Sequence, residues 1–215
     1  MDTSIVMIHY CEDDARAAIA EKCIKAIQPY RNASTEFILV CNGFYDGLSA
    51  YCDRYQEREA DASPGRSFNI GARIAQGNIL AFLCNDILVS GNWLDECIEI
   101  VLKHPHYLAT PAYVSNRKYH ELPMVDGYCV NERVGSDILV MTREQFNDIG
   151  EFDEVNPMYD GSNYINRRLK KGYPVIMTRK PLAVNIGTGH SYAKQQAQMG
   201  YTYKPDYKDR KWLPE

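Results

Sequence analysis

The chain has 215 residues, of which 45% are hydrophobic and 24% are charged, and its formal net charge is −4. This composition is typical of a globular domain that is long enough for one sizeable core. No apolar run approaches the ~20 residues of a membrane-spanning helix, and the acidic start MDTSIVMIHYCEDD lacks the basic leader of a secretory signal. The negative charge gives no general attraction to nucleic acid or anionic lipid.

The cysteines number seven and form no CxxC pair. An odd number without close pairs indicates neither a disulfide framework nor a zinc site. Cys23, Cys41 and Cys97 lie inside apolar runs, where a free cysteine behaves as a small hydrophobic residue. We therefore expect a reducing compartment, the cytoplasm.

The first half of the chain alternates strand and helix signals. Strands are predicted at 5–9, 37–41 and 79–83, and helices at 15–27, 48–55, just before Gly77 and at 94–101. Asp13 or Asp14 would cap the first helix, and residues 56–65 read as a loop. Regular alternation of this kind predicts right-handed crossovers and a mostly parallel sheet.

The alternation lapses after Pro111. Residues 112–133 are tyrosine-rich and irregular, which indicates a binding excursion more than scaffold. Regularity returns with a strand at 137–141, a helix with a Thr142–Gln145 capping box that ends at Gly150, a helix at about 162–171 closed by Gly172, and short strands at 175–177 and 183–186. No internal repeat or low-complexity linker interrupts the chain, so we expect one continuous unit.

An acidic residue, Asp86, directly follows the buried strand at 79–83. Ligands of open α/β sheets bind beyond the carboxyl ends of the strands, where a carboxylate can hold a divalent cation against a diphosphate. The alternative is that Asn85 and Asp86 only form a turn. A GxxxxGK[ST] phosphate loop, a GxGxxG motif between strand and helix and a GxSxG elbow are all absent from the sequence.

Further short motifs follow one another in a fixed order. They are Ile8-His9-Tyr10, Cys41-Asn42-Gly43-Phe44, Asn69 with Gly71, Ala75 and Gly77, Leu83-Cys84-Asn85-Asp86 with Trp93-Leu94, Gly150-Glu151-Phe152-Asp153-Glu154, Asp160 to Arg168 with Gly172-Tyr173, and Lys211-Trp212. No single motif is specific. The ordered set, over nearly the whole chain, resembles the family 2 glycosyltransferases of the GT-A fold.

This resemblance implies a fold and a reaction. The fold would be a single GT-A-like α/β domain, Rossmann-like, with a mostly parallel central sheet flanked by helices. Residues 1–110 would form the nucleotide-sugar-binding half, 111–190 the acceptor and catalytic half, and 191–215 a C-terminal tail. The reaction would be an inverting, metal-assisted transfer of a hexose-type sugar from a nucleoside diphosphate sugar to a hydroxyl acceptor, with Mn²⁺ or Mg²⁺ as cofactor.

The resemblance also implies site residues. The donor-binding residues would be His9, Tyr10, Cys41, Asn42, Arg66, Asn69, Asn85 and Asp86. Asp86 would ligate the metal together with a late ligand, either His190 or Asn185. Asp160 would be the catalytic base, with Asp153 as its competitor. Cys41 occupies, or lies next to, the position at which many members of the family have an aspartate that contacts the nucleotide base.

The resemblance leaves the chemical class of the acceptor open. A glycan, a lipid or a modified DNA base is possible. The modified DNA base is considered because compact members of the family also occur in bacteriophages, where the protein would act in the host cytoplasm. An acid-free basic stretch fits an anionic acceptor, although a solvated helix face is the simpler explanation; it comprises Arg167, Arg168, Lys170, Lys171, Arg179 and Lys180. No membrane span is expected.

Two other functions remain open. The family's acid pairs are reduced in this chain, which is compatible with a catalytically inactive nucleotide-binding module. A sugar-nucleotide pyrophosphorylase-like nucleotidyltransferase shares the architecture. It is disfavoured because residues 10–14 read YCEDD in place of a glycine-rich, arginine-containing loop.

Overall fold

The computed structural model describes residues 2–10, 13–43, 46–58, 63–113, 124–131, 137–154 and 160–186, and the statements below concern these residues. The strands are β1 Thr3–Tyr10, β2 Thr35–Asn42, β3 Arg54–Arg58, β4 Ile79–Cys84, β5 Ile87–Val89, β6 Leu108–Tyr113, β7 Met124–Val125, β8 Tyr128–Asn131, β9 Ile138–Thr142 and β10 Val175–Asn185. The helices are α1 Asp14–Ile27, α2 Pro64–Ile74, α3 Trp93–Lys103, α4 Arg143–Ile149 and α5 Asp160–Lys170, with 3-10 helices at Gln28–Tyr30 and Asp46–Tyr51.

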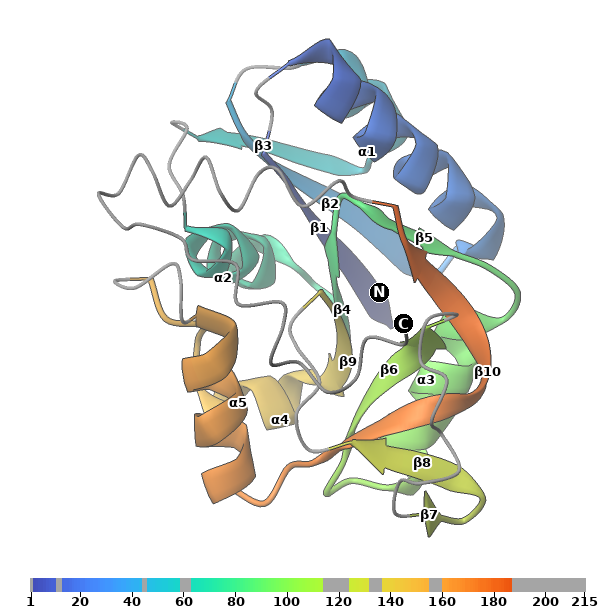
Figure 1. Ribbon diagram of the computed structural model, residues 1–215. Helices are drawn as coiled ribbons and strands as arrows, with labels where there is room; N and C mark the ends of the chain where they lie inside the picture. Colours follow the sequence, from blue (N-terminus) through green and yellow to red (C-terminus); the bar gives the residue numbers. More distant parts are fainter. Residues whose placement is uncertain are drawn as a thin grey trace, which may run out of the picture.

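All the described strands belong to one sheet, in the order β3-β2-β1-β4-β9-β6-β10-β8-β7, with β5 paired to β10 (Figure 1). The first four strands in this order are parallel, and β10 is parallel to β6. Between these two groups lies β9, which is antiparallel to both of its neighbours. An α/β fold with a central sheet that is mostly parallel near the core is therefore confirmed. Because β9 is reversed, it begins at the edge of the sheet where β4 ends.

Helices cover both faces of the sheet. In β1, Ile5 and Met7 belong to a core shared with α1 and α3, whereas Val6 and Ile8 belong to a second core shared with α2, α4 and α5. Figure 1 shows α2, α4 and α5 together on one side of the sheet. A strand that is buried on both faces needs apolar residues at successive positions, which explains the short apolar runs in the sequence. None of the described helices combines the length and apolarity that a membrane crossing requires.

The predicted helix ends are confirmed at several positions. Asp13 caps α1 by accepting a hydrogen bond from the Arg16 amide at 2.9 Å. Thr142 and Gln145 form both hydrogen bonds of a capping box at the start of α4. Gly150 and Gly172 adopt φ values of 89° and 81°, a left-handed backbone that favours glycine and ends the preceding helices.

The predicted helix at 48–55 is wrong. The chain instead forms a 3-10 helix and then β3, the edge strand parallel to β2. Asp53 begins this pairing, because its carboxylate accepts from the Phe37 amide at 2.7 Å while its own amide donates to the Phe37 carbonyl at 2.9 Å. Arg54 then pairs with the buried carboxylate of Glu36 at 3.0 Å. These tertiary partners override the local helical pattern.

The expectations around α2 also need correction. This helix starts at Pro64, inside the predicted loop, and ends at Ile74, before Gly77. A side chain on Gly77 would bring a Cβ atom to 2.5 Å from the Ser4 amide nitrogen, so glycine is required there for close packing and not as a helix stop. Likewise, β6 continues to Tyr113 where irregular chain was predicted, and the two short late strands are the single strand β10.

Candidate functional site

Most of the predicted site residues lie at one edge of the sheet. The parallel strands β1, β2 and β4 end there with His9-Tyr10, Cys41-Asn42 and Cys84, and the turn Asn85-Asp86 follows β4. Ligands of α/β sheets bind at this carboxyl edge. The structure thus brings the donor-binding candidates of three strands together, as expected.

Asp86 is held at this edge by the end of β10. Its carbonyl oxygen accepts a hydrogen bond from the Ile186 amide at 2.8 Å, and its carboxylate accepts one from the side chain of Asn185. Burial raises the pKa of the carboxyl group, while hydrogen bonds from its own main-chain amide and from the Asn185 side chain, together with the charge of Arg16, oppose the shift. Asn185, one of the two candidates for the late ligand, therefore lies against Asp86. The other candidate, His190, lies outside the described residues.

A second carboxylate, that of Asp137, was missed by the sequence reasoning. It immediately precedes β9, and its carbonyl oxygen accepts from the Cys84 amide at 2.8 Å. Asp137 as a whole is exposed, but its carboxyl group is largely surrounded by protein atoms. This desolvation and the negative charge of Asp86 raise the pKa of the carboxyl group to about 6. Burial raises the pKa of the Tyr113 hydroxyl, at the end of β6, and the negative charges of Asp137 and Asp86 add to this shift.

These residues give the edge a set of oxygen ligands. Carboxylate and amide oxygens from Asp86, Asp137 and Asn185 suit a hard divalent cation such as Mg²⁺ or Mn²⁺. Within the described residues, no group of three or more His, Cys, Asp or Glu side chains is placed to hold a metal. A cation here would depend on two carboxylates, an amide and oxygens of the ligand that it accompanies.

His9, at the end of β1, lies against the side chain of Asn85 and is neutral. Burial, and to a lesser extent the charge of Arg16, lower its pKa to about 4. Its Nδ1 lies 2.8 Å from the Asn85 amide nitrogen and so accepts a hydrogen bond, which leaves the proton on Nε2. Nε2 is buried and has no hydrogen-bond partner among the described residues. The donor contacts predicted for His9, Tyr10 and Asn85 stay predictions.

The end of β2 is tied to its surroundings. Cys41 is fully buried, and its side chain interacts with the hydroxyl of Tyr55, whose pKa is raised mainly by burial. Asn42 accepts a hydrogen bond from Ser67 of α2 at 3.0 Å, and Arg58 donates to the same Ser67 hydroxyl at 2.9 Å. Contacts of Cys41 and Asn42 with a nucleotide stay predictions.

The two candidates on α2 differ. Arg66 lies in the first turn of α2, where its side chain is exposed and pairs with Glu154 at 3.4 Å. Asn69 is fully buried, and its amide is hydrogen-bonded to Phe152 and Glu154. The donor contact predicted for Asn69 finds no support in this geometry, because its side chain points into the protein and its polar atoms are engaged.

The candidate bases lie in or after the segment that follows α4. Asp153 is half-buried in this segment, and Asp160 is the first residue of α5. The side chain of Asp160 is outside the described part of the structure, so the choice between these two acids stays a prediction.

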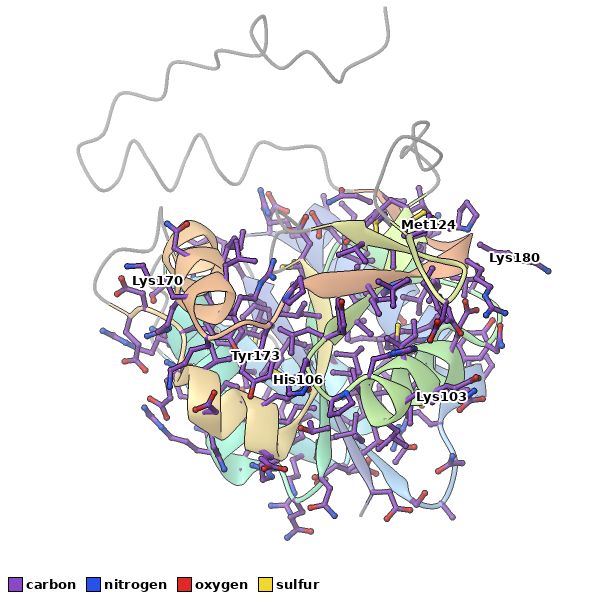
Figure 2. The ribbon with its side chains drawn as sticks, turned by 90° about the horizontal axis from the view of Figure 1, so that it is seen from below. Lys103, His106, Met124, Lys170, Tyr173 and Lys180 are labelled. Carbon is purple, nitrogen blue, oxygen red and sulfur yellow. The ribbon has the colours of Figure 1, made fainter. Side chains whose placement is uncertain are left out.

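The basic stretch at 167–180 does not form one free face. Arg168 is fully buried and donates to the Tyr173 carbonyl at 2.9 Å, and Lys171 pairs with Asp148 at 3.0 Å. Figure 2 shows Lys170 at the left and Lys180 at the right of the molecule, far apart in this view. Arg168 is therefore turned toward the core and belongs to no solvated face of α5, and a contact of the other basic residues with an anionic acceptor stays a prediction.

The sequence of the chain matches a known protein family. The family model described as Glycosyl transferase family 2 matches residues 4–168 of the chain. No curated protein gives a significant match.

Solved structures share the fold at low sequence identity. The crystal structure of GalNAc-T7 with UDP, GalNAc and Mn²⁺ has 12% identity and a TM-score of 0.70, over 86% of this chain and 44% of that one. The mannosyltransferase PcManGT from Pyrobaculum calidifontis in complex with GDP-Man and Mn²⁺ has 15% identity and a TM-score of 0.71, over 91% and 61%. S. aureus TarS has 11% identity and a TM-score of 0.65, over 97% and 42%. The chain spans about half the length of these proteins.

Proposed function

The chain belongs to glycosyl transferase family 2, and we propose that it transfers a sugar from a nucleoside diphosphate donor to a hydroxyl acceptor with inversion at the anomeric carbon. The observation that carries this proposal is the position of Asp86. It lies at the carboxyl edge of a parallel sheet, beside a second carboxylate and the amide of Asn185. Two structures with this fold were solved with Mn²⁺ and either UDP or GDP-Man.

We assign the following roles within this proposal. Asp86 and Asn185, with Asp137 beside them, would hold Mn²⁺ or Mg²⁺, which when bound neutralises charge on the departing diphosphate. Arg66 offers an exposed guanidinium in the first turn of α2, a group that matches phosphate geometry. Asp160, or its competitor Asp153, would accept the proton of the acceptor hydroxyl, a step that typically contributes ~10²–10⁴-fold to the rate.

We also propose that the two halves of the chain have different roles. Residues 1–110 carry β1, β2, β4 and Asp86, and they would bind the donor. Residues 111–190 carry α5 and β10 and would shape the acceptor side. A glycan, a lipid and a modified DNA base all remain possible acceptors.

A nucleoside diphosphate and Mn²⁺ are expected to stabilise the protein together. At 100 times its dissociation constant, a ligand that binds only the folded state adds about 2.7 kcal/mol to the free energy of unfolding. Melting curves with UDP, GDP and dTDP, each with and without Mn²⁺, measure this effect. If no nucleotide raises the melting temperature in the presence of Mn²⁺, the proposed donor site is wrong.

A further inference from the structure

Asn69 joins α2 to the segment Gly150–Glu154, which precedes α5. Its Oδ1 accepts from the Phe152 amide at 2.9 Å, and its Nδ2 donates to the Phe152 carbonyl at 3.0 Å and to the Glu154 carboxylate at 2.8 Å. One buried side chain thus satisfies both main-chain polar groups of Phe152. Such a buried amide is costly to remove, because every partner that it leaves would lose its hydrogen bond.

The segment also lies directly against the first turn of α2. A Cβ atom on Gly65 would lie 2.5 Å from the Asp153 carbonyl oxygen and 3.1 Å from the Phe152 Cβ. The Ser63 hydroxyl donates to the Glu154 carbonyl at 3.4 Å. The absence of a side chain at position 65 therefore allows the two backbones to approach each other.

The other side of the segment contacts α5. The ring of Phe152 stacks on that of Tyr164 with centroids 4.1 Å apart, and it also packs on Phe68 and Phe82 at 5.1 and 5.2 Å. Arg167 donates to the Glu151 carbonyl. A displacement of Phe152 would therefore change the packing of α5, whose first residue is Asp160.

The donor side is bound to the same helix. Ser67 of α2 donates to Asn42 at the end of β2, and α2 leads into β4, after which Asp86 lies. Ser67 and Asn69 are two residues apart and fully buried. Helix α2 thus contacts both the end of β2, which is expected to bind the nucleotide, and the segment that precedes the candidate base.

We propose that Asn69 is a positioning residue that fixes the segment Phe152–Glu154, and through it the start of α5, relative to the donor. This inference rests on the proposed function. Asn69 has no role in binding the donor; it acts through Phe152 on the placement of Asp160. Misplacement of a reacting group by about 1 Å can cost ~10²-fold in rate, so small shifts of the segment matter.

Two substitutions perturb this contact in different ways. Asn69→Ala removes the three hydrogen bonds, whereas Gly65→Ala keeps the Asn69 side chain and instead inserts a methyl group between α2 and the segment. Gly71→Ala is the matched control, because its added methyl group would meet Val6 of β1 at 2.2 Å, on the other face of the helix. All three variants disturb the packing of α2, but only the first two touch the segment.

Turnover and donor binding are measured below the melting temperature of each variant. We expect Asn69→Ala and Gly65→Ala to lower kcat at least about tenfold while the KM for the donor and its Kd with Mn²⁺ change less than about twofold. Gly71→Ala at a matched loss of melting temperature should keep kcat near that of the wild type. An equal fall of kcat in Gly71→Ala, or a rise of donor Kd in Asn69→Ala, would overturn the positioning role.

Hydrogen exchange makes the outcome independent of activity. In Asn69→Ala, amides of 150–154 and of α5 should exchange at least about tenfold faster, while those of β1 and β2 stay as in the wild type. Faster exchange confined to α2, or spread uniformly over the sheet, contradicts the inference. If the selective change is seen but the wild type neither binds nor turns over any donor, the proposed function fails and the coupling between α2 and α5 stands.

Discussion

Replacing Asp160 with asparagine is expected to lower turnover at least ~10²-fold while donor affinity stays within about twofold of the wild type. The variant removes a proton acceptor but keeps the size and hydrogen-bonding shape of the side chain. Asp160 opens α5, and that helix is anchored one turn later by the buried Tyr164. Nucleotide release and donor titration, measured on the same preparation, separate the two quantities.

The same measurement on Asp153→Asn identifies the base. Unchanged turnover in Asp160→Asn together with a loss in Asp153→Asn would move the role to Asp153. Equal losses of binding and turnover in Asp160→Asn would show that Asp160 is a structural cap of α5.

Replacing Asp86 with asparagine is expected to abolish the stabilisation that depends on Mn²⁺ and to lower turnover at least ~10²-fold, since a Lewis-acid cation contributes several kcal/mol to such a reaction. Asparagine has nearly the same size as aspartate and can keep the contact with Asn185, but it lacks the charge that attracts the cation. Calorimetric titration of Mn²⁺ in the presence of nucleotide, with parallel melting curves, measures the loss.

Asp148→Asn is the matched control for this charge change. Asp148 is an exposed carboxylate on α4, paired with Lys171, and α4 follows β9 at the edge opposite Asp86. It should leave Mn²⁺ affinity unchanged. Retention of wild-type Mn²⁺ affinity and turnover in Asp86→Asn would remove Asp86 from the cation site.

The strands that carry the donor side are predictable because they are buried on both faces. Ile79 to Leu83 is an uninterrupted apolar run, so the sequence alone indicates a central strand and places Asp86 at its carboxyl end. Helix caps are equally local, as the Thr142–Gln145 capping box illustrates. Features of this kind depend only on neighbours in the chain.

Asp137 could not be found in this way. Its importance comes from the reversed direction of β9, which brings the start of that strand to the edge where β4 ends. Strand direction is a property of the assembled sheet and leaves no mark on the alternation of apolar residues. Edge strand β3 was missed for a related reason, because its partner β2 decides its conformation.

The burial of Arg168 has a local signal in the sequence. Arg168 lies four residues after Tyr164, so both share one face of α5, and both are buried. The charge pattern alone suggested a solvated or phosphate-binding face. Asn69 is comparable, since nothing local distinguishes an amide that binds a ligand from one that binds the main chain of a distant segment.

Nucleotide release from a panel of UDP-, GDP- and dTDP-sugars in the presence of Mn²⁺ measures the proposed activity most directly. We expect one class of donor to release its nucleoside diphosphate, with water as a slow substitute for the acceptor, and the release to require both Mn²⁺ and Asp86. No release from any donor, by protein that binds a nucleotide together with Mn²⁺, would indicate a catalytically inactive module. Formation of a nucleoside triphosphate on addition of pyrophosphate would indicate a nucleotidyltransferase, and either result would contradict glycosyl transfer.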